Sequence, residues 1–151
     1  MAQSNVKKLP VRKASPVRKP ANSAKKTSTT FIGADIEWRE TKGKGRGVFA
    51  LRDIKKGTMI EKSPAIPVAY DDVPEGDAPD GYLLDWDPDT KGEEHVMVLG
   101  YIMLYNHSSK PTLYLENDYE EMTIASFAGR DIKAGEELTW DYNCEIWFDE
   151  E

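Results

Sequence analysis

The chain has 151 residues, with a single cysteine, Cys144, and two histidines. One cysteine excludes an internal disulfide and a thiolate zinc cluster and favours a reducing compartment, and no segment approaches the roughly 18 apolar residues of a membrane-spanning helix. The formal net charge of −7 is unevenly distributed, because residues 1–34 hold eight of the 20 basic residues and no acidic one. Residues 35–151 therefore carry 12 basic against 27 acidic residues, a net charge of about −15.

The first 31 residues differ in composition from the rest of the chain. They are rich in Lys, Arg, Pro, Ser, Thr and Ala, and Phe31 is the first aromatic residue. Such a segment buries too little apolar surface to offset the entropy of ordering it. We predict a disordered basic tail at residues 1–31 and one folded domain at residues 32–151.

The folded part begins with short apolar runs separated by Gly, Pro and Asp, a pattern typical of short strands. The first strands are expected at residues 48–51, 59–61 and 66–70. A turn at residues 53–57 (DIKKG) separates the first two, and residues 131–135 (DIKAG) repeat its chemistry. This local sequence similarity is too short to indicate an internal duplication.

The middle of the chain places acidic loops beside apolar segments. Residues 71–81 and 87–93 are rich in Asp, Pro and Gly and are predicted loops on either side of residues 82–86. Residues 95–105 form the most apolar run, in which Gly100 indicates close packing of the backbone.

The last third of the chain again reads as strands. Residues 113–115 and 122–127 predict a hairpin around Asn117 and Asp118, and residues 138–142 predict a final strand. The whole pattern indicates a mainly β domain with few short helices.

Three polar or glycine-rich clusters stand out: GKGRGVFA at residues 43–50, YNHSSKP at residues 105–111 and RDIKAGEELTWDY at residues 130–142. The glycines of the first permit either a tight turn or close approach of backbone to a ligand, and the Lys and Ser or Thr of a phosphate-binding loop are missing. The second places Asn and His at the edge of the core, where they either pair with core groups or contact the edge of a purine-like ligand. No carboxylates lie at ligand spacing around the histidines, so no metal site is expected.

In this order the three clusters resemble the SET domain family, in which a GRGVFA-like loop, an NHS-containing segment and an RDIKAGEELTWDY-like segment follow one another. The resemblance covers about residues 35–148 and is most like the minimal viral and bacterial SET proteins. It implies small curved sheets with a C-terminal pseudoknot, an exception to the usual absence of knots. The pseudoknot would bring Asn106 and His107 next to Tyr142.

The resemblance implies roles for individual residues. The cofactor loop matches Gly45, Arg46 and Gly47. The pair that holds the adenine and the methionine part of the cofactor matches Asn106 and His107.

The aromatic residues of the site follow in the same way. Tyr142 matches the catalytic tyrosine that also borders the cofactor, and Tyr82 matches a second catalytic tyrosine. The lysine channel would be lined by Trp140, Tyr82 and Tyr105. Trp147 matches the aromatic residue that covers the adenine.

Two departures from the family pattern are visible. The family's NHSCxPN has Ser109 in place of Cys and Thr112 in place of the final Asn. Trp140 stands where the family commonly has Phe or Tyr, a position associated with the number of methyl groups added. Trp has no hydroxyl to hold a water but is larger than Phe, so the degree of methylation stays open.

The resemblance implies a protein-lysine N-methyltransferase that uses S-adenosylmethionine, releases S-adenosylhomocysteine and needs no metal. Its substrate would be a Lys-rich protein such as a histone tail, which the acidic domain would attract. Further expected partners are the chain's own tail, methylated at Lys13 or Lys19, and a second copy in a homodimer; nucleic acid would bind only through the tail, and no membrane partner is expected. The protein would be intracellular, cytoplasmic in a bacterium and nuclear or chromatin-associated in a eukaryote or virus.

Two other functions fit the same sequence. Ser109, Thr112 and Trp140 also suit a non-catalytic SET-like module that binds peptides or proteins without turnover. The basic tail alone suits association with chromatin or nucleic acid without enzymatic activity. Deletion of residues 1–30 distinguishes this last alternative from the methyltransferase. The deletion would abolish a function carried by the tail alone, but would leave cofactor binding by the folded domain intact.

Overall fold

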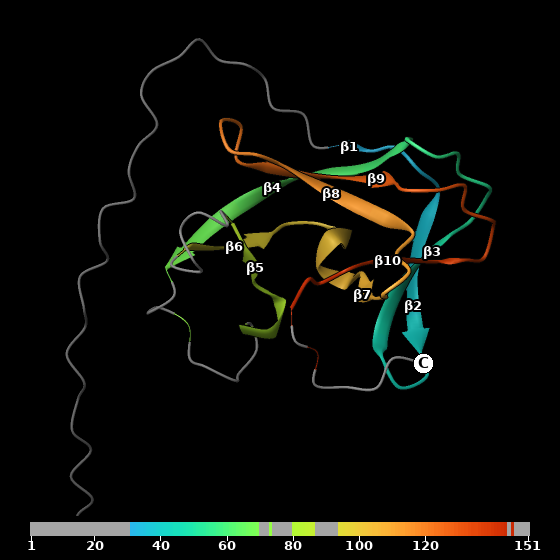
Figure 1. Cartoon of the computed structure of the whole chain (residues 1–151), viewed down its shortest axis with the longest axis horizontal. Coiled ribbons are helices and arrows are strands. Elements are labelled where there is room, and N and C mark those ends of the chain that lie inside the picture. The colour runs from blue at the N-terminus through green and yellow to red at the C-terminus, as the bar shows by residue number, and fades with distance from the viewer. Residues whose placement is uncertain (1–30, 70–72, 74–79, 87–93, 145, 147–151) are drawn as a thin grey trace, which may run out of the picture.

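The folded part of the chain is built from short strands with two short 3₁₀ helices in the described residues (Figure 1). The computed structural model describes residues 31–69, 73, 80–86, 94–144 and 146, so residues 1–30 of the predicted tail, most of the two acidic loops and Trp147 lie outside the described residues. Phe31, placed at the end of the predicted tail, instead pairs with Lys62 in a strand. The elements are β1 (Phe31–Ile32), β2 (Ile36–Thr41), β3 (Gly45–Ala50), β4 (Met59–Ala69), η2 (Asp80–Tyr82), β5 (Leu84–Asp85), β6 (Glu94–Val98), η4 (Tyr101–Leu104), β7 (Asn106–His107), β8 (Leu113–Asp118), β9 (Thr123–Ala128) and β10 (Glu137–Trp140). The predicted mainly β fold is confirmed. Within the described part of the chain, no helix has the length and apolar character needed to cross a membrane.

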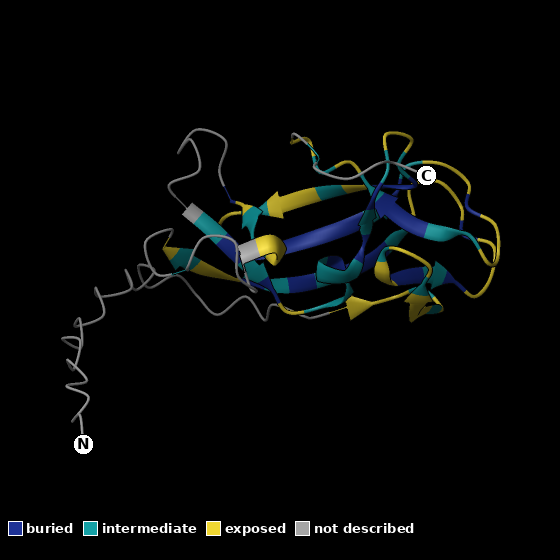
Figure 2. Ribbon diagram, turned by 90° about the horizontal axis from the view of Figure 1, so that it is seen from below, coloured by how far each residue is buried: buried dark blue, intermediate teal, exposed yellow. Residues whose placement is uncertain are grey.

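The strands form two sheets. The first has the order β5-β6-β4-β9-β8, with β1 added alongside β4, and the second has the order β2-β3-β10-β7. Figure 2 shows buried residues along the inner strands and exposed residues at the outer edges and turns. The core contains apolar side chains from both sheets and from η4, among them Val48, Ile60, Val96, Ile102, Ile124 and Leu138. Burial of these side chains is the main force that holds the two sheets and η4 together.

The predicted strands at residues 59–61 and 66–70 are joined in the structure, because β4 runs without interruption over 11 residues. Its first half pairs with β9, and from Ala65 onward it pairs with β6 instead. Pro64 is the last residue paired with β9 and Pro67 lies in the stretch paired with β6. A proline disrupts a strand only where its missing N–H would have been needed, and β4 continues through both prolines, so the two predicted strands are one.

The predicted hairpin exists, but its turn lies later than expected. Asn117 and Asp118 belong to β8 and pair with Ile124 and Thr123 of β9. The turn ends at Met122, which has a φ of 54°. Asp118 Oδ1 accepts the backbone N–H groups of Glu120 and Glu121, so Asp118 ends β8 and stabilises the turn that follows it.

The last strand joins segments that are far apart in the sequence. β10 pairs antiparallel with β3, where Leu138 opposes Val48, and parallel with β7, where Thr139 and Trp140 oppose Asn106 and His107. The parallel pairing of the C-terminal segment with β7 carries the residues after Trp140 past His107. The glycine-rich, NHS-containing and C-terminal clusters therefore meet around one strand.

Candidate active site

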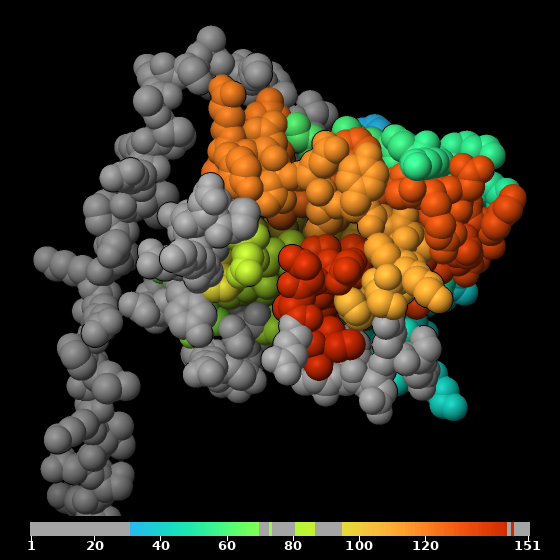
Figure 3. All heavy atoms as spheres, in the orientation of Figure 1, coloured from blue at the N-terminus to red at the C-terminus, as the bar shows by residue number. Residues whose placement is uncertain are grey.

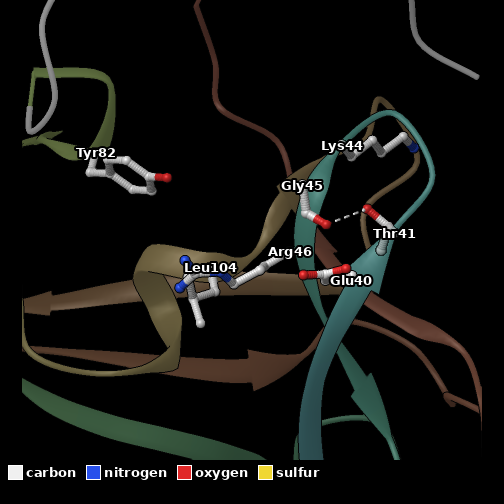
Figure 4. A pocket seen from close by; sticks show the side chains of 7 residues that line it. All are labelled: Glu40, Thr41, Lys44, Gly45, Arg46, Tyr82 and Leu104. Atoms are coloured by element: carbon white, nitrogen blue, oxygen red, sulfur yellow. Dashed lines mark hydrogen bonds between the residues drawn. The ribbon is translucent and has the colours of Figure 1, made fainter.

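The glycine-rich cluster forms the turn from β2 into β3, and its glycines serve different purposes. Gly43 and Gly45 have φ values of 87° and 71°, which only glycine adopts without strain. The hydroxyl of Thr41 donates to the Gly45 carbonyl at 3.2 Å and closes this turn (Figure 4). Gly47 is buried, and a Cβ there would lie 2.5 Å from Oε1 of Glu137 and 3.0 Å from Nδ2 of Asn106.

Asn106 is fixed by two hydrogen bonds from one nitrogen. Its Nδ2 donates to the backbone carbonyl of Arg46 at 3.1 Å and to Oε1 of Glu137 at 2.7 Å. Both N–H groups of the amide are then used, so the side chain offers Oδ1 as an acceptor. A ligand beside Asn106 would therefore be recognised through a donor, such as an ammonium group.

His107 and Tyr142 contact each other directly. The ring of His107 is largely buried, and its Nδ1 accepts the backbone N–H of Tyr142 at 3.2 Å. Their ring centroids lie 5.3 Å apart at an angle of 62°, and the rings of Trp140 and Tyr142 lie 5.2 Å apart.

The hydroxyl of Tyr142 has a defined orientation. It donates to the backbone carbonyl of Tyr105 at 3.0 Å, which leaves the lone pairs of the phenol oxygen to accept from another group. Burial raises the pKa of Tyr142 above its ordinary value, and the nearby Cys144 and Tyr82 act in the same direction. The phenol is therefore neutral at physiological pH.

A hollow of about 340 Å³ opens beside these residues. It is lined by Glu40, Thr41, Lys44, Gly45, Arg46, Tyr82 and Leu104. Figure 4 shows the hydroxyl of Tyr82 pointing from η2 toward the glycine turn, with the side chain of Arg46 directed to Leu104. A second, apolar hollow of about 390 Å³ shares Tyr82 and Leu104 and continues over Met97 and Met103.

The C-terminal segment, the segment around β7 and residues 80–86 share one face of the molecular surface. In the space-filling view the red C-terminal segment lies between a yellow-green surface, the colour of residues 80–86, and an amber surface that follows β7 (Figure 3). Asn106 contacts the glycine turn through the Arg46 carbonyl, and Tyr142 has both His107 and Tyr82 as neighbours. Trp147, the predicted cover of the adenine, lies outside the described residues.

Tyr105, expected to line the lysine channel, is placed differently. Its side chain is only 2% exposed, and its hydroxyl hydrogen-bonds to Glu61 and lies 3.4 Å from that of Ser126. The ring therefore belongs to the core, and the part of Tyr105 that reaches the site is its backbone carbonyl, which Tyr142 contacts.

The departure at Thr112 has a structural explanation. Its hydroxyl accepts the backbone N–H of Thr139 at 2.8 Å, and its own N–H donates to the Thr139 carbonyl at 3.1 Å. Thr112 thereby attaches the loop after β7 to β10. A hydroxyl provides this attachment as an amide would, so the altered motif still brings the C-terminal segment to Asn106.

Sequence reasoning missed two carboxylates of the site region. Glu137 orients Asn106, and it was quoted only as part of the last motif. Glu61 is fully buried beneath η4. The available signal was a charged residue inside the apolar run Met59–Glu61, which in a buried strand requires partners.

The sequence profile of the SET domain family matches residues 45–143, which is more than half of the chain. The chain belongs to the SET domain family. A curated relative from the fission yeast Schizosaccharomyces pombe, a histone-lysine N-methyltransferase specific for H3 lysine 37, is 32% identical to this SET protein over 123 residues. That alignment covers 80% of this chain and 81% of the relative.

Solved structures agree with the SET fold. A structure from Plasmodium falciparum, named as a candidate histone methyltransferase, has a TM-score of 0.60 and 25% identity and covers 78% of this chain and all of its own. KRYPTONITE, crystallised with mCHG DNA and SAH, has a TM-score of 0.59 and 22% identity over 76% of this chain and 25% of its own. A second KRYPTONITE structure, which also holds an H3(1–15) peptide, has a TM-score of 0.60. These likenesses extend over nearly the whole described SET domain.

Proposed function

We propose that this chain is a protein-lysine N-methyltransferase that transfers a methyl group from S-adenosylmethionine to the ε-amine of lysine in a basic protein, a histone or histone-like tail. The observation that carries the proposal is the convergence of the glycine turn, Asn106, His107 and Tyr142 around β10. Family membership and the yeast histone-lysine methyltransferase support the enzyme class. KRYPTONITE, which binds SAH and an H3 peptide, supports the donor and the substrate.

The residues present fit the proposed donor. Gly47 has no side chain, which leaves the Arg46 backbone and the Asn106 amide in contact. The Asn106 oxygen suits an ammonium group, as in the methionine part of the donor. The donor would supply a methyl group on a sulfonium, and Gly45, Arg46, Gly47, Asn106 and His107 would hold it.

Tyr142 is proposed to position the lysine amine. A phenol that is neutral and already donates its proton to the Tyr105 carbonyl accepts from the amine rather than removing a proton from it. Methyl transfer needs a neutral amine aligned with the methyl group, about 3 Å away. Desolvation between Tyr82, Trp140 and Tyr142 would favour the neutral amine, because burial disfavours a charged ammonium.

The charge of the folded domain suits a basic substrate. Residues 35–151 carry a net charge of about −15, which raises the local concentration of Lys- and Arg-rich segments and their rate of association. The chain's own tail is one such segment, and Lys13 and Lys19 are proposed sites of self-methylation. A histone substrate would place the activity on chromatin.

The test is incubation of the full chain with labelled S-adenosylmethionine and a panel of histones, beside Tyr142→Phe. We expect label on a histone lysine and a fall in kcat of about a hundredfold for the variant, because the amine loses its positioning group. Mass spectrometry of the tail tests self-methylation in the same samples. Donor binding without any label on histones or tail would contradict the proposal and favour the non-catalytic binding module.

A further inference from the structure

Glu61 is a buried carboxylate that lies outside the methyl-transfer pocket. It belongs to β4 and is 0% exposed. Burial raises its pKa, while the hydroxyls of Ser63 and Tyr105 and the backbone N–H groups of Tyr101 and Ile102 act in the opposite direction. A buried carboxyl group is costly unless it is well hydrogen-bonded. The four donors explain how this one is tolerated.

The partners of Glu61 lie at the two ends of η4. Oε1 accepts the backbone N–H of Tyr101, the first residue of η4, at 2.9 Å. Oε2 accepts the phenol of Tyr105, the residue that directly follows η4, at 3.2 Å. One carboxylate therefore holds both the start and the end of this short helix.

The absence of a side chain at Gly100 leaves space for the Glu61 carboxylate. A Cβ at Gly100 would overlap Oε1 of Glu61 and would also lie too close to the hydroxyl of Ser63. The backbone of Gly100 is extended, with a φ of −176°, so space and not conformation requires glycine there. The residue that the sequence marked for close packing thus packs against a charged group.

The end of η4 leads directly into the active site. The carbonyl of Tyr105 accepts the Tyr142 hydroxyl at 3.0 Å, and Asn106 and His107 follow in β7. Leu104, the last residue of η4, lines both hollows. A rotation of η4 would therefore move the acceptor that orients Tyr142.

We propose that Glu61 is a positioning residue, which holds Tyr101 and Tyr105 so that the Tyr105 carbonyl orients the hydroxyl of Tyr142. The inference deepens the proposed function and rests on it for the role of Tyr142. Glu61 does not touch the substrate or the donor in this scheme. Its effect passes through η4 and the Tyr105 backbone.

Tyrosine NMR tests the arrangement without requiring activity. The full chain is labelled at the tyrosine ζ carbon, the Tyr142 signal is assigned with Tyr142→Phe, and its pKa is measured by titration. Glu61→Gln has only one side-chain oxygen and cannot accept at both ends of η4, and Tyr105→Phe removes the anchoring hydroxyl. In both variants we expect the pKa of Tyr142 to fall, because the protonated phenol loses its hydrogen bond to the carbonyl, and to stay above the ordinary value, because burial still raises it.

Ser63→Ala is the matched control, because it removes a hydrogen bond to the same carboxylate but leaves the Oε2 bond to Tyr105. We expect an unchanged pKa of Tyr142 in this variant. In a methyl-transfer assay, Glu61→Gln and Tyr105→Phe should lower kcat about tenfold, with the KM for the lysine peptide within about twofold of wild type.

Each outcome decides one claim. If both variants lose thermal stability but keep the wild-type pKa of Tyr142, Glu61 is only structural and the inference is overturned. If the wild-type chain methylates no lysine, the proposed function fails, while the NMR titration still decides whether Glu61 orients Tyr142.

Discussion

Two regions of the molecule use the same residue types for different ends. The paired turns, residues 53–57 (DIKKG) and 131–135 (DIKAG), lie at the surface and hold distant loops together. The pocket region, which comprises Gly47, Asn106, Glu137 and Tyr142 beside the hollow that Gly45 and Arg46 line, uses a glycine and a carboxylate at buried or half-buried positions. Comparing the two separates what serves the fold from what serves the chemistry.

The paired turns bind each other reciprocally. Asp53 accepts from the Lys133 ammonium at 2.7 Å and the Ala134 N–H at 3.0 Å. Asp131 accepts from the Lys55 ammonium at 2.8 Å and from the backbone N–H of Lys56 at 3.0 Å. Between them the backbones of Ile54 and Ile132 exchange two hydrogen bonds of 2.9 Å. The two similar segments, residues 53–57 and 131–135, are thus hydrogen-bonded to each other in the fold.

Gly47 and the glycines of the paired turns are required for different reasons. Gly57 and Gly135 have φ values of 79° and 86°, and a Cβ on either would meet nothing within 4 Å. Gly47 has no positive φ, but a Cβ there would strike Glu137 and Asn106. Conformation demands glycine in the paired turns, as it does at Gly43 and Gly45, whereas space demands it at Gly47.

The carboxylates differ in the same way. In the exposed turns, the hydrogen bond from Lys133 lowers the pKa of Asp53, and that from Lys55 lowers the pKa of Asp131. Beneath the pocket, burial raises the pKa of Glu61. An exposed carboxylate next to a lysine is stabilised as an anion, whereas a buried one depends on its surrounding donors.

The largest effect is expected for Gly47→Ala. The added methyl group must displace Glu137 or the Asn106 amide, so affinity for S-adenosylhomocysteine should fall about tenfold or more. Isothermal titration calorimetry measures the loss, and circular dichroism verifies that the variant is folded. Unchanged affinity would contradict the claim that the space at Gly47 is needed for ligand binding.

A smaller effect is expected for Gly57→Ala, and it should appear in the stability of the protein and not in its affinity for the donor. A left-handed conformation at alanine should lower the free energy of unfolding by about 1 kcal/mol, measured by urea denaturation. Donor affinity should equal that of the wild type, since Gly57 lies outside the pocket. Gly135→Ala is the twin control, and a clearly unequal loss between the two would contradict the symmetry of the paired turns.

The smallest effect is expected for Asp131→Asn. A folded-state pKa below the ordinary 3.8 means that Asp131 adds stability above that pH and loses it as the pH falls through the lowered value. The variant should therefore have a slightly lower urea midpoint than the wild type near pH 7, and the two midpoints should converge as the pH falls below 3.8 through the lowered pKa. Added salt should narrow the gap at pH 7, because exposed ion pairs are screened. A gap that persists in acid would assign the effect to packing.

Local patterns in the sequence were sufficient for part of this fold. The turns at residues 53–57 and 131–135 were predictable because Gly57 and Gly135 supply the left-handed backbone conformation that ends each turn. Their reciprocal bonding was not, because it depends on a backbone pairing between Ile54 and Ile132 that only the tertiary fold creates. Likewise, residues 59–61 and 66–70 were predicted as separate strands, because the change of partner strand along β4 is invisible locally.

The same limit applies to the site. Asn106, His107 and Tyr142 were identified through motif order, and their contacts confirm that they lie together. The aromatic character of Tyr105 suggested a channel wall, but its hydroxyl is held by Glu61, and that partner lies 44 positions away in the sequence. Roles set by distant buried partners are the ones that sequence patterns do not reveal.

The most direct test is calorimetric titration of the full chain with S-adenosylhomocysteine, beside Asn106→Ala from the pocket and Asp131→Asn from the paired turns. A pocket built by Asn106 and the glycine turn predicts one-site binding by the wild type and by Asp131→Asn, and binding weakened about tenfold or more in Asn106→Ala. No detectable binding by the wild type, or equal binding by all three proteins, would contradict a donor site at these residues.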